Sequence, residues 1–220
     1  MLELETQWER DLFFALNGSD SIFLDNFFWL YSFKWIWIPF YLCFLFVLIY
    51  RQKGKEILWI LASIALVIFL CDYIASGIAK PFFHRFRPSH HPDFKDQVDL
   101  VFGYVGGRYG FFSSHASNTF GLAMFSALLF RNRFFSCAIF TFALLNAYSR
   151  VYLGVHFISD VVVGALVGSL IGYLVFQLYN IKKQKPVFSK KRIHLLCFFY
   201  IGCVLLLMAL NQPLVDWLHR

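Results

Sequence analysis

Charged residues are scarce in this sequence: Asp, Glu, Lys and Arg together make up 15% of its 220 residues. Hydrophobic residues make up 59%, whereas soluble domains contain about 45–50%. The mean hydropathy is +0.61, and no polar block is large enough to form a separate soluble domain. This composition excludes an ordinary soluble protein and predicts a single integral-membrane domain over residues 1–220.

The sequence also lacks the spacings that mark metal and redox sites. None of the five cysteines belongs to a Cys-x-x-Cys pair, and all five lie inside apolar runs, so we expect buried thiols rather than disulfides. His90, His91 and Asp93 lie close together, but no further ligand follows at a useful spacing, and we expect no metal and no other cofactor. A Gly-x-Ser-x-Gly motif is absent, which argues against a serine esterase built on Ser113.

The N-terminus has no basic segment ahead of an apolar one, so it does not resemble a signal peptide. Four of the first eleven residues are acidic. Apolar residues recur near helical spacing, at Leu2, Trp8, Leu12, Phe13 and Leu16. Residues 1–26 therefore predict an amphipathic helix on the bilayer surface.

Six stretches approach the roughly 20 apolar residues that a membrane-crossing helix needs. They are residues 34–50, 57–78, 111–130, 134–148, 157–179 and 193–210. The sequence thus predicts an all-α, polytopic bundle of about six transmembrane helices. Trp29, Trp35 and Trp37 are typical of an aromatic belt at the membrane interface.

Basic residues are concentrated in alternate connections, after the first, third and fifth stretches. The positive-inside rule places these connections in the cytoplasm. The lysine-rich segment 182–192 is one of them; it could also recognise anionic lipid, but topology explains it equally well. The other two connections, residues 80–110 and 149–156, then face outward, on the periplasmic side of an inner membrane.

These outward connections contain three clusters of polar residues. Several of these residues are Lys or Arg, which the positive-inside rule disfavours on the outer face, and such exceptions favour a functional role. The first cluster runs from Lys80 to Pro88, the second is Phe-Ser-Ser-His at 112–115, and the third runs from Ser149 to Asp160. With this topology all three lie at one membrane face.

The clusters supply groups that suit a phosphate. Lys80, Arg87 and Arg150 provide three cations, two of them guanidinium groups that match phosphate oxygens. Ser113, Ser114 and the backbone N–H groups at the start of the third helix can add neutral donors. Such a set stabilises a phosphoryl group in its transition state.

Two histidines have separate chemical tasks in this arrangement. His156 and Asp160 are four residues apart and share one helical face, so the carboxylate can fix the imidazole tautomer and leave the other nitrogen free to attack. His115 can protonate the leaving oxygen and then activate the water that hydrolyses phosphohistidine.

The pattern Lys-x6-Arg-Pro, then Ser-x-His, then Ser-Arg-x5-His-x3-Asp resembles the type-2 phosphatidic acid phosphatase superfamily, in its small bacterial form. The resemblance covers residues 72–168. It implies a helical bundle with a phosphate pocket at the membrane surface, and the same roles for the residues named above. The family's usual Pro-Ser-Gly-His differs here, because Phe112 replaces the proline and Ser114 the glycine; serine fits if its φ is negative.

The resemblance implies hydrolysis of a lipid phosphomonoester or diphosphate at the membrane, with no nucleic-acid partner. The substrate stays open among an isoprenyl diphosphate such as undecaprenyl diphosphate, lipid A, phosphatidylglycerol phosphate and phosphatidic acid, and the loop 92–110 is expected to choose among them. A lipid phosphotransferase using the same site is the alternative. An anion transporter is a weaker one, since transport has no need of two histidines.

Two further features bear on packing. Asp72 lies eight residues before Lys80 on the same helical face and could pair with Lys80 or Arg150. Gly164, Gly168 and Gly172 repeat every four residues, which we interpret as close packing within the bundle rather than a dimer seam. The oligomeric state is not predicted.

Overall fold

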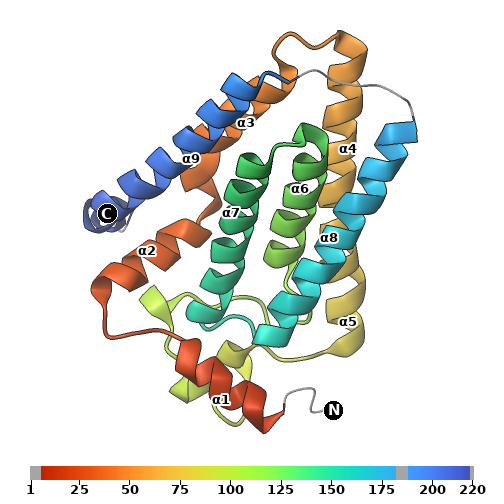
Figure 1. Cartoon of the computed structure of the whole chain (residues 1–220). Coiled ribbons are helices and arrows are strands. Elements are labelled where there is room, and N and C mark those ends of the chain that lie inside the picture. Colours follow the sequence, from red (N-terminus) through yellow and green to blue (C-terminus); the bar gives the residue numbers. More distant parts are fainter. Residues whose placement is uncertain (1–5, 182–187, 219–220) are drawn as a thin grey trace.

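The computed structural model describes residues 6–181 and 188–218 and is helical throughout, apart from connecting loops (Figure 1). The extended pairing found in these residues is a single antiparallel bridge between Phe86 and Tyr109. The prediction of an all-α bundle is therefore confirmed. The helices are α1 (Gln7–Leu16), α2 (Ile22–Ser32), α3 (Ile38–Ile49), α4 (Gly54–Asp72), α5 (Lys80–Phe83), α6 (Ser114–Phe130), α7 (Arg133–Tyr152), α8 (Ile158–Ile181), α9 (Lys190–Ala209) and α10 (Asn211–Leu218).

Four helical segments in the described residues are long and apolar enough to cross a membrane: Gly54–Phe83, Arg133–Tyr152, Ile158–Ile181 and Lys190–Ala209. The pair Ile22–Ser32 and Lys34–Ile49, bent by 69°, would make a fifth span. Helix α6 has 17 residues and is shorter than these spans. Each of the six predicted stretches corresponds to a helix, whereas α2 and α10 were not predicted.

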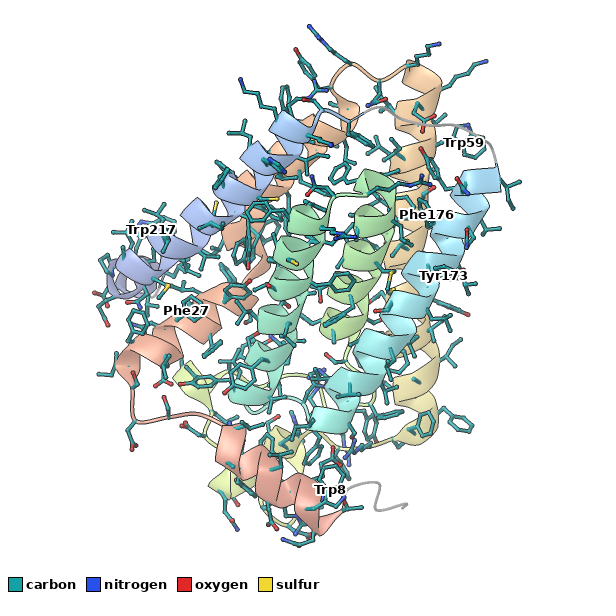
Figure 2. The ribbon with its side chains drawn as sticks, viewed as in Figure 1. Trp8, Phe27, Trp59, Tyr173, Phe176 and Trp217 are labelled. Carbon is teal, nitrogen blue, oxygen red and sulfur yellow. The ribbon has the colours of Figure 1, made fainter. Side chains whose placement is uncertain are left out.

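Large apolar side chains cover the outside of the bundle. Trp59, Tyr173 and Trp217 are all exposed and come from three different helices (Figure 2). In water, apolar patches of this extent are unfavourable, but in a bilayer they face acyl chains. The outer surface therefore fits the membrane location that the composition indicates.

Helix α6 is packed between α7 and α8 (Figure 1), and glycines allow α8 to approach it closely. A Cβ atom at Gly164 would lie 2.6 Å from the carbonyl oxygen of Ser113, and Cβ atoms at Gly168 and Gly172 would overlap carbonyl oxygens of α6. The interpretation of these glycines as packing positions is confirmed. The contact also holds the start of α8 against the start of α6.

The connections between helices lie at the two ends of the bundle as the predicted topology requires, with the basic connections at one end and the motif clusters at the other. Figure 1 shows the α3–α4 connection, the α6–α7 turn and the beginning of α9 at one end, and α1, α5 and the starts of α6 and α8 at the other. The three motif clusters thus share one end. Of the basic segment 182–192, residues 182–187 lie outside the described residues.

Helix α1 is amphipathic, as predicted, but its inner face packs on the protein. Phe13 is fully buried and Glu9 is 3% exposed. Trp8 is 63% exposed and Leu12 is also exposed, so the outward apolar face remains available to a bilayer surface (Figure 2). Residues 1–5 of the predicted interfacial region lie outside the described residues.

The prediction of an aromatic belt is wrong for one of its tryptophans. Trp37 is 1% exposed, and its indole N–H donates to the carbonyl oxygen of Tyr31 at 2.8 Å. Trp35, two residues earlier, is exposed. The bend between α2 and α3 turns Trp37 into the core, which composition alone could not indicate.

The α6–α8 contact predicts that Gly168→Ala lowers the thermal unfolding midpoint in detergent, with a cost of about 1–3 kcal/mol from overpacking against α6. Gly202→Ala on α9 is the matched control, because a Cβ atom there meets no atom within 4 Å. That variant should unfold at the wild-type temperature or slightly above it. Equal midpoints for the two variants would contradict the packing role.

Candidate active site

The segment after α5 is extended, and this conformation gives two arginines a common direction. Phe86 pairs with Tyr109 in the bridge, and the main chain is tied on both sides by Arg87 N–H to Arg108 O and Gly110 N–H to Arg85 O. Because alternate residues of an extended chain point to one side, Arg85 and Arg87 both point into the protein, where both are buried.

His156 lies in the turn between α7 and α8 and is 1% exposed. Its Nδ1 atom is 3.3 Å from Asp160 Oδ2, an oxygen that also accepts the N–H of Phe157 at 3.1 Å. Its Nε2 atom is 2.8 Å from Arg87 Nη1. A guanidinium group can only donate, so Nε2 carries the lone pair and the ring hydrogen is on Nδ1, facing Asp160.

The charge state of His156 follows from its surroundings. Burial lowers its pKa well below the usual 6.5, and the positive charges of Arg87, Arg150 and Lys80 lower it further. The imidazole is therefore neutral at physiological pH. Burial and the nearby Arg150 also lower the pKa of Arg87 to about 10, which leaves that guanidinium protonated.

The end of α7 builds the turn that holds His156. Arg150 is buried, and its carbonyl oxygen accepts the N–H groups of both Val155 and His156. Its guanidinium donates to the Tyr104 hydroxyl at 3.0 Å. One residue thus fixes the backbone of the histidine turn and places a cation beside it.

Lys80 follows a π-helical turn, Tyr73–Ala79, which joins α4 to α5. Its ammonium donates to Ser114 Oγ at 3.3 Å and to Ser76 Oγ at 3.2 Å. The Ser76 hydroxyl in turn donates to Asp72 Oδ1 at 3.4 Å. Asp72 is therefore linked to Lys80 through a serine, and not by the direct pair that we considered.

The second motif forms the start of α6. Ser113 is buried and caps the helix, its hydroxyl oxygen accepting the N–H of Ala116 at 3.4 Å, while its own N–H donates to the carbonyl oxygen of Asp160 at 3.0 Å. Ser114 is the first helical residue, so its φ is negative and serine fits in place of glycine. Phe112 is buried against Ala75 and Ala79.

His115 lies in the first turn of α6 and opens onto a cavity of about 550 Å³ between α3, α4, α6 and α7. Ser114 and Asp72 also line this cavity, and its walls are mostly apolar. The lining residues are Ser32, Lys34, Tyr41, Phe44, Leu45, Leu48, Leu61, Ile64, Ile68, Asp72, Ser114, His115, Asn118, Thr119, Leu122, Phe142 and Asn146.

The backbone of the loop 92–110 lies against the buried side chains of Asp160 and Arg87. A Cβ atom at Gly110 would lie 2.9 Å from Asp160 Oδ2, and one at Gly106 would lie 3.0 Å from the Arg87 guanidinium carbon. Glycine at these positions lets the loop backbone approach both side chains. The loop also supplies Tyr104 to Arg150.

All eight predicted site residues lie at this end of the bundle, in two groups. The first group is His156, Asp160, Arg87 and Arg150, at the histidine turn. In the second group Ser114 and His115 line the cavity and Lys80 donates to Ser114, while the Ser113 N–H joins the two groups through the carbonyl oxygen of Asp160. In the described part of the chain no hydrogen bond joins His115 to His156, and the positive charge of Arg150 together with burial lowers the pKa of His115 to about 3. No three His, Cys, Asp or Glu side chains there are grouped closely enough to hold a metal ion.

The sequence reasoning missed two buried charges in contact with this site, Arg85 and Glu9. Arg85 donates to Asp160 Oδ1 at 2.7 Å and to Glu9 Oε2 at 2.8 Å. The sequence contained a signal for Arg85, because it lies two residues before Arg87 in an extended segment and so points to the same side. No local pattern marks Glu9.

A buried His–Asp pair lies beside cationic side chains at one end of an apolar helical bundle, an arrangement that suits a membrane protein acting on a phosphate. The model of the PAP2 superfamily matches residues 56–184, and the chain belongs to that superfamily. Enzymes of this superfamily are metal-independent phosphoric ester hydrolases.

Two curated relatives and one solved structure are similar to this chain. The "Lipid A 4'-phosphatase" of Porphyromonas gingivalis is 40% identical, over 99% of this chain and 97% of that protein. The protein of the same name from Bacteroides thetaiotaomicron is 37% identical, over 80% and 79%. The crystal structure of Aquifex aeolicus LpxE superposes with a TM-score of 0.60 at 26% identity, covering 80% of this chain and 99% of that one.

The depressed pKa of His156 predicts how stability depends on pH. Between its folded pKa and about 6.5, the unfolded chain binds one more proton at this residue, so stability falls as pH falls below about 6.5, by at most about 1.4 kcal/mol per pH unit. Above about 6.5 the residue is neutral in both states and has no effect.

His156→Gln should therefore have a shallower loss of thermal midpoint between about pH 6.5 and about pH 5 than the wild type, measured in detergent. His194→Gln, which removes an exposed imidazole from α9, is the matched control for loss of a histidine. A wild-type slope in His156→Gln would contradict the burial of a neutral imidazole.

Proposed function

We propose that the chain hydrolyses a phosphomonoester of lipid A at the membrane surface, by way of a phosphohistidine formed on His156. The observation that carries this proposal is the orientation of His156, whose Nδ1 atom faces Asp160 while its Nε2 lone pair faces Arg87. A neutral imidazole held in one tautomer beside cations is an activated nucleophile aimed at an anion.

In the first step the Nε2 atom of His156 attacks phosphorus, and the bond between phosphorus and the lipid oxygen breaks. The Arg87 guanidinium, which donates to Nε2 in this structure, would donate to the phosphoryl oxygens instead, together with Arg150 and Lys80. The negative charge of the bound phosphate offsets the cations that lower the pKa of His115, so that His115 takes up a proton on substrate binding and gives it to the leaving lipid oxygen. Asp160 stabilises the positive charge that the His156 ring acquires.

In the second step His115, now neutral, takes a proton from water as the water oxygen attacks phosphorus. The bond between nitrogen and phosphorus breaks, inorganic phosphate leaves, and His156 returns to its neutral form. The same residue therefore serves as acid and then as base. Transfer to a second lipid would need a lipid hydroxyl in place of this water.

The cavity supports an amphiphilic substrate. It begins at His115 and Ser114 and continues between apolar side chains of four helices. A phosphate at the polar end would leave acyl chains along the apolar walls, where they are shielded from water. Lipid A is the first candidate because the two bacterial relatives are named for its 4'-phosphate.

We infer the orientation in the membrane from the distribution of charge. The α3–α4 and α6–α7 connections, both with an excess of Lys and Arg, lie at the end of the bundle opposite to the site. The positive-inside rule therefore supports a site on the periplasmic face of the inner membrane.

The mechanism predicts different defects for the two histidines. His156→Ala should lower kcat on lipid A by about 10³-fold or more, and no phosphoenzyme should be trapped when the reaction is quenched in alkali. His115→Ala should lower kcat on lipid A by about 10²–10⁴-fold, because the first step then lacks its acid and the second step its base. With an aryl phosphate, whose good leaving group needs no acid, His115→Ala should be phosphorylated and should accumulate phosphoenzyme.

His194→Ala is the control for these measurements, since His194 lies on α9 and away from the site. It should keep wild-type activity. A folded His156→Ala protein that still releases phosphate would overturn the mechanism.

The substrate assignment predicts that lipid A loses its 4'-phosphate faster than phosphatidic acid, phosphatidylglycerol phosphate and undecaprenyl diphosphate release phosphate under the same conditions. We expect a difference in kcat/KM of about tenfold or more, measured as free phosphate with mass spectrometry of the lipid product. Phosphate recovered on a second lipid instead would identify a phosphotransferase. Equal rates on all four lipids would remove lipid A as the preferred substrate.

A further inference from the structure

A chain of buried charges runs from the N-terminal helix to the histidine turn. Glu9 on α1 accepts from Arg85 at 2.8 Å, and Arg85 donates to Asp160 at 2.7 Å. Asp160 Oδ2 faces His156 Nδ1 at 3.3 Å. All four side chains are at most 3% exposed, so water screens these charges little.

The two oxygens of the Asp160 carboxylate have separate partners. Oδ2 faces the His156 ring, whereas Oδ1 accepts from Arg85. An arginine in this position, if it were not balanced, would draw the carboxylate charge away from the histidine. Glu9 provides the balance from the other side of the guanidinium.

Glu9 sets the net formal charge of this group of four residues. With His156 neutral, Glu9, Arg85 and Asp160 together carry one negative charge. When the Nε2 atom of His156 bonds to phosphorus, the ring becomes cationic and the four residues together become neutral. Without Glu9 the count would change from neutral to positive in a site that already contains Lys80, Arg87 and Arg150, which is unfavourable at low dielectric.

Glu9 also fixes the position of helix α8. Its Oε1 atom accepts the N–H of Ser159 at 2.9 Å, one residue before Asp160. Arg85 donates to the Ser159 hydroxyl at 2.6 Å and lies over the Phe157 ring at 4.5 Å from its centroid. The start of α8 is thus held by groups from α1 and from the first motif.

We propose that Glu9 and Arg85 are positioning residues for the His156–Asp160 pair, and that α1 is therefore a part of the active site. Glu9 supplies a negative charge that balances Arg85, so that the charge of Asp160 remains available to stabilise the cationic histidine of the phosphorylated state. Arg85 bridges Glu9 and Asp160 and orients the Asp160 carboxylate. This inference rests on the proposed phosphohistidine mechanism.

The competing explanation is a structural ion pair that only fastens α1 to the bundle. Buried pairs often contribute little to stability beyond the cost of burying them. The two explanations differ in which kinetic quantity they affect. A fastening role changes folding, whereas the positioning role changes the rate of phosphorylation and leaves phosphate binding intact.

Glu9→Gln tests the inference, because it removes the charge and keeps the shape. Its kcat on lipid A should fall about tenfold or more, with KM and the inhibition constant for inorganic phosphate within about twofold of the wild type. Rapid-quench measurement should place the loss in phosphoenzyme formation. Glu9→Asp, which keeps the charge, should recover part of the lost rate.

Asp11→Asn is the matched control. Asp11 lies on the same helix, is exposed, and loses the same charge in this substitution. It should keep wild-type kcat. Equal kcat in Glu9→Gln and the wild type would overturn the inference, and so would equal losses in Glu9→Gln and Asp11→Asn.

A second variant covers the case in which Glu9→Gln does not fold. Arg85→Lys keeps the positive charge but cannot bridge Asp160 and Glu9 with two nitrogens. It should lower kcat about tenfold or more while phosphate inhibition is preserved, and a wild-type kcat would overturn the inference. His156→Ala, assayed alongside, separates the two proposals: its activity would remove the mechanism, whereas its inactivity beside a fully active Glu9→Gln would remove only the role of Glu9.

Discussion

The buried carboxylate of Asp160 is the group on which the geometry of this site depends. A charge with no exposed surface must be paired and hydrogen-bonded, and here the Arg85 guanidinium, the Phe157 N–H and the His156 ring meet that need. The main-chain oxygen of the same residue accepts the N–H of Ser113. The hydrogen bonds of Asp160 therefore orient the histidine and also attach the start of α6 to the start of α8.

Helix packing makes this arrangement possible. The glycines of α8 remove the side chains that would otherwise separate it from α6, and the two helix starts meet as a result. Most of the predicted site residues then project from helix ends or from the turns beside them. Such sites combine the rigidity of packed helices with the unpaired N–H groups of a helix start, which favour an anion.

The distribution of charge distinguishes the two ends of the molecule. Lys80, Arg87 and Arg150 all lie at one end, where burial and the positive charge of Arg150 lower the pKa of Arg87 to about 10. Such crowding is unfavourable unless an anion relieves it, which is what a phosphate does on binding. The apolar cavity beside them completes a site suited to a molecule with a charged head and hydrocarbon chains.

The sequence by itself determined the helical membrane class, the approximate bounds of the long helices, and the three motifs at one end, because hydropathy and spacing are local properties. Only the tertiary structure revealed Glu9, which meets Arg85 across 76 residues of sequence, the serine between Asp72 and Lys80, and the burial of Trp37. These features depend on which helix faces come together. Which faces meet depends on the packing of all the helices together, and a short pattern of residues does not specify it.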